Sequence, residues 1–290
     1  MFETFKSQRI KTSGTEIHVT VGGSGPPLLL LHGYPQTHLM WHKVAPVLAK
    51  EFTVVVPDLR GYGESGKPKT SDDHAPYSKR AMAIDQVEVM AALGYKDFFL
   101  AGHDRGARVS HRMAIDHPNA VKKIAVLDII PTLKVFDEVD QRVATSYFHW
   151  FFLIQPNDFP EKMIGHDPRG YLISRLDRWG GNLDAFPQEV VEEYVRLFNN
   201  PACIHSTCED YRAGASIDLV HDRADLQAKI QMPLLALWGT KGLVGSAYDP
   251  LACWRERASD VRGFAIDSGH FIPEEKPQDT IKALRAFFAN

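Results

Sequence analysis

Residues 98–106 read FFLAGHDRG, an apolar run followed by a G-x-D-x-G turn, and helical spacing continues through Val109 and Met113. A strand, a sharp turn and a helix in this order form the setting of a nucleophile elbow, which presents one side chain at the edge of a sheet. The side chain presented here is Asp104, where serine is the usual residue. Glycine and aspartate are also common in ordinary turns, so the motif needs support from the rest of the chain.

Apolar runs and helical patterns alternate on both sides of this motif. The predicted strands are Ile17–Val21, Pro27–Leu31, Phe52–Val56, Phe98–Ala101, Lys123–Leu127, Pro233–Trp238 and Gly263–Ile266. Helices are predicted at Ser78–Leu93, near Leu251–Arg257 and at Gln278–Phe288. Nearly uninterrupted apolar strands are typical of a parallel sheet covered by helices on both faces. The sequence therefore predicts an α/β fold with a mostly parallel central sheet.

The middle of the chain has a different character. Residues 136–213 are rich in aromatic residues, prolines and helical patterns and lack strand-like runs. We interpret this segment as an inserted helical cap, and residues 1–135 and 214–290 as one discontinuous core. The chain has 290 residues, which is long enough for one such unit with an insertion. The interface between cap and core is the expected pocket.

Composition argues against several classes of function. The chain has 33 lysines and arginines against 36 acidic residues, a formal charge of −3, and no dense basic run, so a nucleic-acid partner is not expected. The sequence shows neither a signal peptide nor an apolar stretch of membrane-spanning length, so no membrane association is expected. Three cysteines without paired spacing favour reduced thiols and a cytoplasmic protein. Residues 58–65 lack the spacing of a phosphate loop, and neither a metal nor a cofactor is expected.

Two further segments lie where a nucleophile elbow would need them. Residues 32–35 (HGYP) follow the apolar strand at 27–31 and are expected to supply a backbone N–H to an oxyanion hole. His270 follows the last predicted strand, on the loop from which this type of fold delivers a catalytic histidine. With 13 histidines in the chain, a surface loop residue is the alternative interpretation, and the elbow is what favours catalysis.

An acid must orient the imidazole of His270. The turn after the strand at 233–238 is one usual place for it, but Gly242 stands where an aspartate would be expected. Asp128, directly after the strand at 123–127, is the other position from which an acid can reach the histidine. Asp128 is therefore the preferred third member.

An aspartate nucleophile changes the predicted chemistry. A carboxylate is already ionised at neutral pH and can displace a leaving group from saturated carbon, which leaves an ester that water activated by His270 would hydrolyse. Arg105 directly follows Asp104. Arg108 comes four residues after Asp104, a spacing that on a helix places the Arg108 and Asp104 side chains on the same face. Cations at a helix N-terminus are mildly disfavoured, whereas guanidinium groups bind carboxylates in a bidentate manner. The substrate is therefore predicted to be a carboxylic acid.

Together, residues 32–35, residues 102–108, Asp128 and residues 268–271 resemble the fluoroacetate dehalogenases, a haloacetate-hydrolysing branch of the α/β-hydrolases. The resemblance covers essentially the whole chain. It implies an α/β-hydrolase fold with a cap, and hydrolysis of fluoroacetate or chloroacetate to glycolate and halide through an aspartyl ester. It also implies that Arg105 and Arg108 bind the substrate carboxylate and that the protein forms a homodimer.

The same resemblance implies a set of halide-binding residues in the cap. These fall on His149, Trp150 and Tyr211, whose N–H and O–H groups suit a small, strongly hydrated fluoride. Packing of the cap is the alternative role for these side chains. Tyr34 stands where the family is expected to have phenylalanine, and this difference is expected to alter the shape of the pocket and not the mechanism.

Three other functions remain open at this point. Epoxide hydrolases use the same Asp–His–acid logic but protonate the epoxide with cap tyrosines and have no need of arginines beside the nucleophile. Haloalkane dehalogenases usually have tryptophan after the aspartate, where this chain has Arg105. A non-catalytic small-molecule receptor on a hydrolase fold would tolerate loss of triad members, whereas Asp104, Asp128 and His270 are all present.

Overall fold

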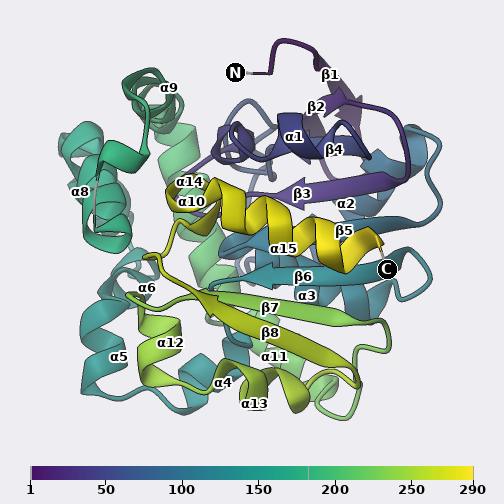
Figure 1. Cartoon of the computed structure of the whole chain (residues 1–290). Helices are drawn as coiled ribbons and strands as arrows, with labels where there is room; N and C mark the ends of the chain where they lie inside the picture. Colours follow the sequence, from purple (N-terminus) through teal and green to yellow (C-terminus); the bar gives the residue numbers. More distant parts are fainter. Residues whose placement is uncertain (1, 182, 290) are drawn as a thin grey trace.

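An eight-stranded sheet runs through the centre of the protein in the computed structural model, which describes residues 2–181 and 183–289 (Figure 1). The strands are β1 (Lys6–Lys11), β2 (Glu16–Gly22), β3 (Pro27–Leu31), β4 (Thr53–Pro57), β5 (Phe98–His103), β6 (Val121–Leu127), β7 (Leu234–Gly239) and β8 (Val261–Ile266). Their order is β1-β2-β4-β3-β5-β6-β7-β8. β2 is antiparallel to both of its neighbours, and all pairs from β4 to β8 are parallel. The predicted mostly parallel sheet is confirmed.

The central strands of the sheet have uninterrupted apolar sequences, which explains why they are buried. Leu28–Leu31 of β3 and Val54–Val56 of β4 have no exposed surface, because helices cover both faces of the sheet. β1 is different, since its KSQRIK sequence is mostly exposed and it pairs only with β2 at the edge. An exposed polar edge strand has no hydrophobic pattern, so periodicity predicts no strand there.

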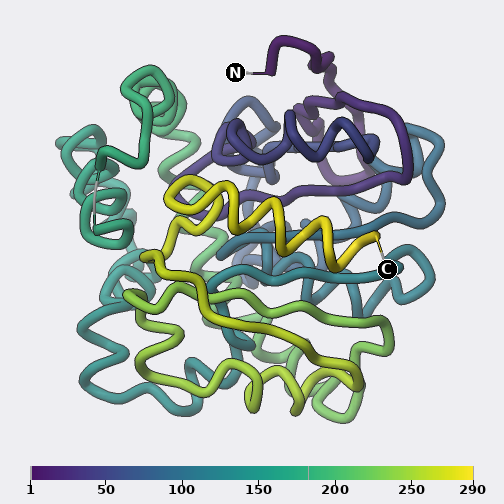
Figure 2. Tube along the Cα trace, in the orientation of Figure 1, coloured from purple at the N-terminus to yellow at the C-terminus, as the bar shows by residue number. Residues whose placement is uncertain are grey.

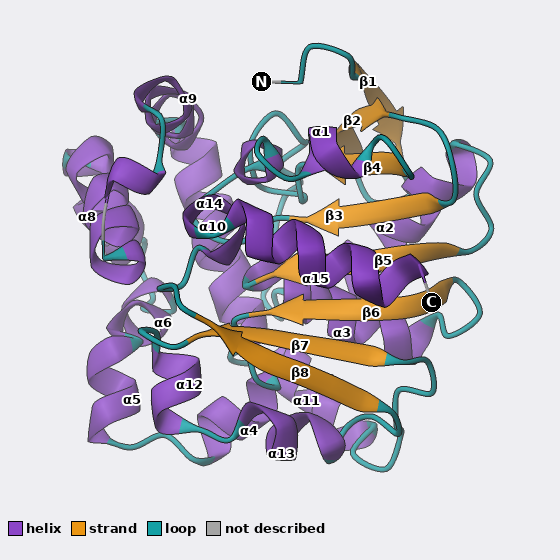
Figure 3. Cartoon of the chain, in the orientation of Figure 1, coloured by secondary structure: helices purple, strands orange, loops and turns teal. Residues whose placement is uncertain are grey.

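Helices cover the two faces of this sheet. Those outside the β6–β7 connection are η1 (His38–Trp41), α1 (Ala45–Leu48), η2 (Ala75–Tyr77), α2 (Lys79–Ala92), α3 (Arg105–Asp116), α12 (Leu243–Ala247), α13 (Pro250–Arg255), α14 (Ile272–Glu275) and α15 (Pro277–Ala289). Figure 3 shows α15 crossing one face of the sheet, with α2 and α3 behind the other. The helices predicted at 78–93 and 278–288 correspond to α2 and α15, and that near 251–257 to α13.

The connection from β6 to β7 is the long insertion. It contains α4 (Thr132–Asp137), α5 (Gln141–Ser146), α6 (Phe148–Leu153), α7 (Phe159–His166), α8 (Pro168–Gly180), η3 (Leu183–Ala185), α9 (Gln188–Phe198), α10 (Pro201–Gly214) and α11 (Ile217–Ala224), and no strand in its described part. In Figure 2 this teal-to-green segment leaves the sheet after β6 and returns as β7. The parallel strands point toward the side where α5, α6, α8 and α9 lie, so the insertion covers the carboxyl edge of the sheet (Figure 1).

The predicted cap boundaries fall within helices of the insertion. The boundary at residue 136 lies inside α4, and the boundary at residue 213 lies one residue before the end of α10.

None of the described helices combines the length and the apolar character that crossing a membrane requires.

Candidate active site

Asp104 lies in a sharp turn between β5 and α3. Its φ of 46° and ψ of −116° are a strained backbone conformation for a residue other than glycine. The turn is closely packed and needs glycine on both sides, because a Cβ would clash with the backbone. A Cβ at Gly102 would lie 2.6 Å from the Gly106 carbonyl oxygen, and a Cβ at Gly106 would lie 2.4 Å from the His32 carbonyl oxygen. The turn therefore has the geometry of a nucleophile elbow, with the Asp104 side chain at the carboxyl edge of the sheet.

The loop after β3 holds one oxygen of this carboxylate. The Tyr34 backbone N–H donates to Asp104 Oδ1 at 2.9 Å, and the loop can approach because Gly33 has no Cβ, which would lie 2.6 Å from that of Asp104. The Arg105 amide, at the first residue of α3, is among those that have no intrahelical acceptor. Asp104 Oδ2 accepts no hydrogen bond from the described residues, which leaves it available as a nucleophile.

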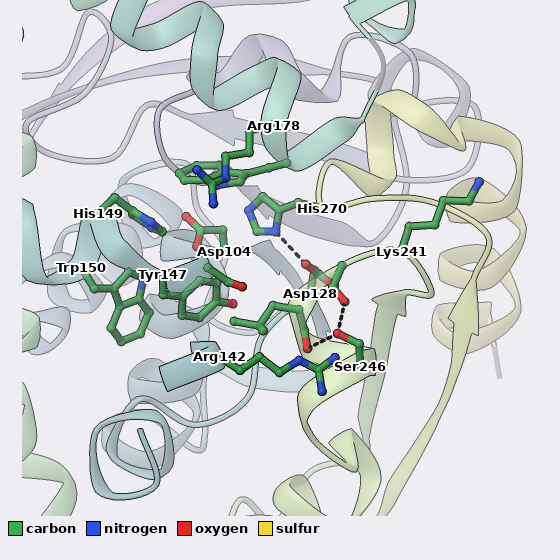
Figure 4. A pocket seen from close by; sticks show the side chains of 14 residues that line it. Asp104, Asp128, Arg142, Tyr147, His149, Trp150, Arg178, Lys241, Ser246 and His270 are labelled. Atoms are coloured by element: carbon green, nitrogen blue, oxygen red, sulfur yellow. Dashed lines mark hydrogen bonds and ion pairs between the residues drawn. The ribbon is translucent and has the colours of Figure 1, made fainter. Parts of the chain in front are cut away.

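His270 and Asp128 complete a hydrogen-bonded chain beside Asp104. His270 Nδ1 donates to Asp128 Oδ2 at 2.7 Å (Figure 4). The Gly239 N–H donates to Asp128 Oδ1 at 2.9 Å. A Cβ at Gly242 would lie only 3.4 Å from Asp128 Oδ2. The two positions at which the sequence allowed an acid are therefore adjacent, and Asp128 is the one that carries it. The structure thus brings Asp104, Asp128 and His270 to one cavity.

Neighbouring charges set the protonation of these groups. Burial opposes ionisation of Asp104, but His270, His103, Arg105 and Arg108 outweigh it and hold the pKa of this carboxyl below its ordinary value. Burial likewise opposes the charged form of His270, and its hydrogen bond to Asp128, together with both carboxylates, raises its pKa. Asp104 is therefore ionised in the free protein, and His270 is poised to hold a proton.

Contacts not foreseen from the sequence fix the loop that carries His270. His103, inside the elbow motif, donates through Nε2 to the His270 carbonyl oxygen at 2.8 Å, and burial lowers the pKa of His103 to about 3. Glu275 accepts from the N–H groups of Gly269 and Phe271 at 2.6 and 2.8 Å. His103 and Glu275 therefore hold the backbone of the loop that carries His270, one by donating and the other by accepting hydrogen bonds.

A cavity of about 270 Å³ lies between the sheet edge and the insertion. Its lining residues are Asp104, Asp128, Arg142, Ser146, Tyr147, His149, Trp150, Arg178, Trp179, Lys241, Gly242, Leu243, Ser246 and His270. Its cations are Arg142 and Arg178, which pair with no acid of the described chain, and Lys241, which pairs with Asp267 at 3.0 Å. None of these three was predicted, because exposed arginines and lysines resemble ordinary surface residues in a sequence.

Arg105 and Arg108 are both buried near Asp104, but each is also bound by the protein. Arg105 donates three hydrogen bonds to Asp210, and Arg108 Nη1 donates to the Ile130 carbonyl at 3.0 Å and to Thr132 Oγ1 at 2.9 Å. Their Cζ atoms lie 5.9 and 4.5 Å from the ring centroid of Trp150. Arg105 Nη1 and Arg108 Nη2 donate to no described residue. Each guanidinium group therefore keeps one terminal nitrogen without a partner in the described chain, although neither arginine is among the residues that line the cavity and both reach it only through their contact with Trp150.

His149, Trp150 and Tyr211 lie together on the insertion side of the site. The rings of His149 and Tyr211 are 5.6 Å apart, and those of Trp150 and Tyr211 are 6.2 Å apart. Tyr211 Oη and His149 Nδ1 are buried without a hydrogen-bond partner in the described chain. Burial keeps both side chains neutral, since it lowers the pKa of His149 and raises that of Tyr211. A buried polar group without a hydrogen-bond partner costs free energy, and a ligand that supplied the missing partner would recover it.

Neither Tyr211 nor Tyr34 is among the residues that line the cavity, and the Tyr34 side chain packs against His149 and Tyr211. Its hydroxyl donates to Tyr171 at 3.1 Å, and its ring is parallel to that of His149 at 6.3 Å and edge-on to that of Tyr211 at 5.2 Å. Its contribution to pocket shape therefore acts through the packing of His149 and Tyr211.

Several known proteins are similar to this chain over nearly its whole length. The profile described as alpha/beta hydrolase fold matches residues 26–277. A fluoroacetate dehalogenase of Burkholderia sp is 48% identical, with 100% of this chain and 96% of that protein aligned. A soluble epoxide hydrolase of Corynebacterium sp. (strain C12) is 38% identical over 96% of this chain and 95% of its own. The crystal structure of a putative alpha/beta hydrolase from Nostoc sp PCC 7120 is 55% identical, covers both chains completely and has a TM-score of 0.99. The chain therefore belongs to the alpha/beta hydrolase family.

Proposed function

We propose that the protein is a haloacetate dehalogenase that converts fluoroacetate or chloroacetate to glycolate and halide through an ester on Asp104. The observation that carries this proposal is the pair of unused guanidinium nitrogens, Arg105 Nη1 and Arg108 Nη2, beside a carboxylate nucleophile. Two guanidinium groups suit a substrate carboxylate and offset its repulsion from Asp104. The similarity to a fluoroacetate dehalogenase of Burkholderia sp supports the same substrate class.

Two further features favour a small anionic haloacid. Arg142, Arg178 and Lys241 line the cavity and make its potential favourable to anions. His149 Nδ1 and Tyr211 Oη have no hydrogen-bond partner in the described chain, and the charge of Asp104 acts on the pKa of both side chains. A halide leaving from the carbon attacked by Asp104 gains charge as the bond breaks, and neutral N–H and O–H donors stabilise that charge.

The reaction divides into two steps. Asp104 Oδ2 attacks the α-carbon, so that a C–O bond forms while the carbon–halogen bond breaks and its electron pair leaves with the halide. His270 then takes a proton from water, whose oxygen attacks the Asp104 carbonyl carbon. The resulting oxyanion is stabilised by the Tyr34 N–H, which already binds Oδ1. Collapse breaks the ester bond, and the departing glycolate oxygen takes the proton from His270. The second proton of the water remains on the new Asp104 carboxyl group, which loses it to solvent, so that Asp104 is regenerated as a carboxylate and one proton is released per turnover.

Formation of the ester changes the electrostatics in favour of the second step. In the free protein the charge of Asp104 helps to raise the pKa of His270. The ester is neutral, so this contribution disappears when the intermediate forms. The imidazole then loses its proton more readily and becomes available as the base.

We expect the two steps to differ in their dependence on pH. Hydrolysis of the ester needs neutral His270, so its rate falls as the pH falls through the pKa of this histidine. Halide release needs only ionised Asp104, whose pKa is lowered, and it persists to more acidic pH. Rapid-quench measurement of the first turnover, compared with steady-state turnover, checks this. An identical pH dependence of the halide burst and the steady-state rate would contradict the assigned roles.

Epoxide hydrolysis is the second candidate. Tyr147 lines the cavity and Tyr211 lies behind it, and burial raises the pKa of both phenols, so each stays protonated as an acid for an epoxide oxygen. A Corynebacterium relative named as a soluble epoxide hydrolase supports this chemistry. A neutral epoxide, however, leaves Arg105 Nη1 and Arg108 Nη2 without an anionic partner.

Purified protein incubated separately with fluoroacetate, chloroacetate and styrene oxide distinguishes these functions. We expect halide and glycolate in equal amounts from at least one haloacetate, and no diol from the epoxide. Diol without halide would replace the proposal with epoxide hydrolysis. A protein that binds glycolate but changes none of the three compounds would favour a receptor.

A further inference from the structure

A buried carboxylate on the insertion holds the guanidinium group that follows the candidate nucleophile. Asp210 lies in α10 and has no exposed surface. Its Oδ2 accepts from Arg105 Nε at 2.9 Å, and its Oδ1 and its carbonyl oxygen both accept from Arg105 Nη2 at 2.8 Å. One residue thus uses three of the five N–H donors of Arg105, and the two on Nη1 remain.

Asp210 is itself fixed from the core. The Tyr62 hydroxyl donates to its Oδ2 at 2.6 Å, and the Lys79 ammonium group pairs with its Oδ1. Burial opposes ionisation of Asp210, but Arg105 and Lys79 outweigh it and hold its pKa well below the ordinary value. Asp210 is therefore ionised, and the hydrogen bonds on both of its oxygens constrain the orientation of Arg105.

The same turn of α10 also places a candidate halide donor. Tyr211 directly follows Asp210, and the Arg105 Cζ atom lies 4.1 Å from the centroid of the Tyr211 ring. Any rotation of the guanidinium group would disturb that contact as well as the direction of Nη1. By holding Arg105, Asp210 therefore also maintains the contact between Arg105 and Tyr211.

We infer that Asp210 is a positioning residue, which holds Arg105 so that Nη1 is free for the substrate carboxylate. The inference rests on the proposed haloacetate dehalogenase function. A purely structural ion pair between insertion and core would need only a negative charge near Arg105 and Lys79. A positioning role also needs the length of the aspartate side chain, and this difference can be tested.

The test compares Asp210→Asn and Asp210→Glu, with Glu209→Gln as the matched control. Glu209 is the neighbouring buried acid of α10 and pairs with Arg212 and His74, away from Arg105. We expect both Asp210 variants to lower kcat/KM for chloroacetate at least about tenfold, because small displacements of a positioning group are costly. Glu209→Gln should stay within about twofold of the wild type, since it loses an ion pair that does not touch the site.

A double-mutant cycle shows whether Asp210 acts through Arg105. We expect Asp210→Asn to change kcat/KM by less than about twofold in an Arg105→Gln background. Full additivity of the two losses, or wild-type kinetics in Asp210→Glu, would overturn the inference. If Asp210→Asn does not fold, the cycle is measured with Asp210→Glu instead, in the wild-type and Arg105→Gln backgrounds, with the same expected outcome.

Failure of the proposed function would be seen separately, in the wild type. Absence of halide release from wild-type protein overturns that function and not the placement of Asp210. Calorimetric binding of acetate to the same variants then decides the inference: a loss of affinity in Asp210→Glu but not in Glu209→Gln supports it, and equal affinities overturn it.

Discussion

Replacing Asp104 with asparagine is expected to abolish release of halide from haloacetates. The amide keeps the size of the side chain and tolerates the positive φ of 46°, but it has no negative oxygen to attack carbon. We expect kcat to fall by more than about 10⁴-fold, as is common when a nucleophile or its activation is lost. Ion chromatography of free halide measures the effect.

Two controls separate loss of chemistry from loss of structure. Asp104→Asn should bind glycolate, because Arg105 and Arg108 are untouched, and its thermal unfolding should stay near that of the wild type. Peptide mass analysis verifies that the amide has not reverted to aspartate. Halide release at more than a few per cent of the wild-type rate from a verified Asp104→Asn sample would remove Asp104 as the nucleophile.

Replacing His270 with asparagine is expected to stop the reaction after one turnover. Asp104 remains ionised and can still be alkylated, whereas water is no longer activated by a base. The variant should release about one equivalent of halide per active site and then fall by at least about 10³-fold in rate. The peptide that contains Asp104 should gain the mass of a carboxymethyl group, which mass spectrometry detects.

His117→Asn is the matched control for this experiment. His117 directly follows α3, the helix that begins just after Asp104, and it is not among the residues that line the cavity. It should retain steady release of both halide and glycolate. Steady turnover in His270→Asn would show that another group activates water, and a missing burst would show that His270 is needed before the ester forms.

The fold was accessible from sequence because its central strands are apolar on both faces. Runs such as Leu28–Leu31 have one simple explanation, which is burial between helices, and they predicted the parallel part of the sheet. β1 was missed because an exposed edge strand with polar residues carries no such pattern. Its pairing with β2 depends on backbone hydrogen bonds that side-chain periodicity does not record.

The candidate triad was accessible for a topological reason. Asp104, Asp128 and His270 each follow a predicted strand, and the carboxyl ends of parallel strands meet at one edge of the sheet. The candidate halide donors were predicted only from resemblance, because an aromatic segment such as that around Trp150 is equally typical of packing.

The partners of the arginines could not be predicted. Helical spacing placed Arg105 and Arg108 near Asp104, but Asp210 and Thr132 meet them only through tertiary packing. No local pattern marks Asp210, which stands among other polar residues of α10. Likewise, His103 reads as a variable position of the elbow motif, although it supports the loop of His270.

A single turnover in ¹⁸O-labelled water tests the central claim, that an ester on Asp104 is formed and then hydrolysed at the aspartyl carbonyl. With protein in excess over chloroacetate, we predict that the hydroxyl oxygen of the first glycolate comes unlabelled from Asp104. The label should instead appear in the peptide that contains Asp104, since water attacks the carbonyl carbon of that side chain. Labelled glycolate hydroxyl in the first turnover, with no label in this peptide, would show direct attack of water on the substrate and would contradict the account.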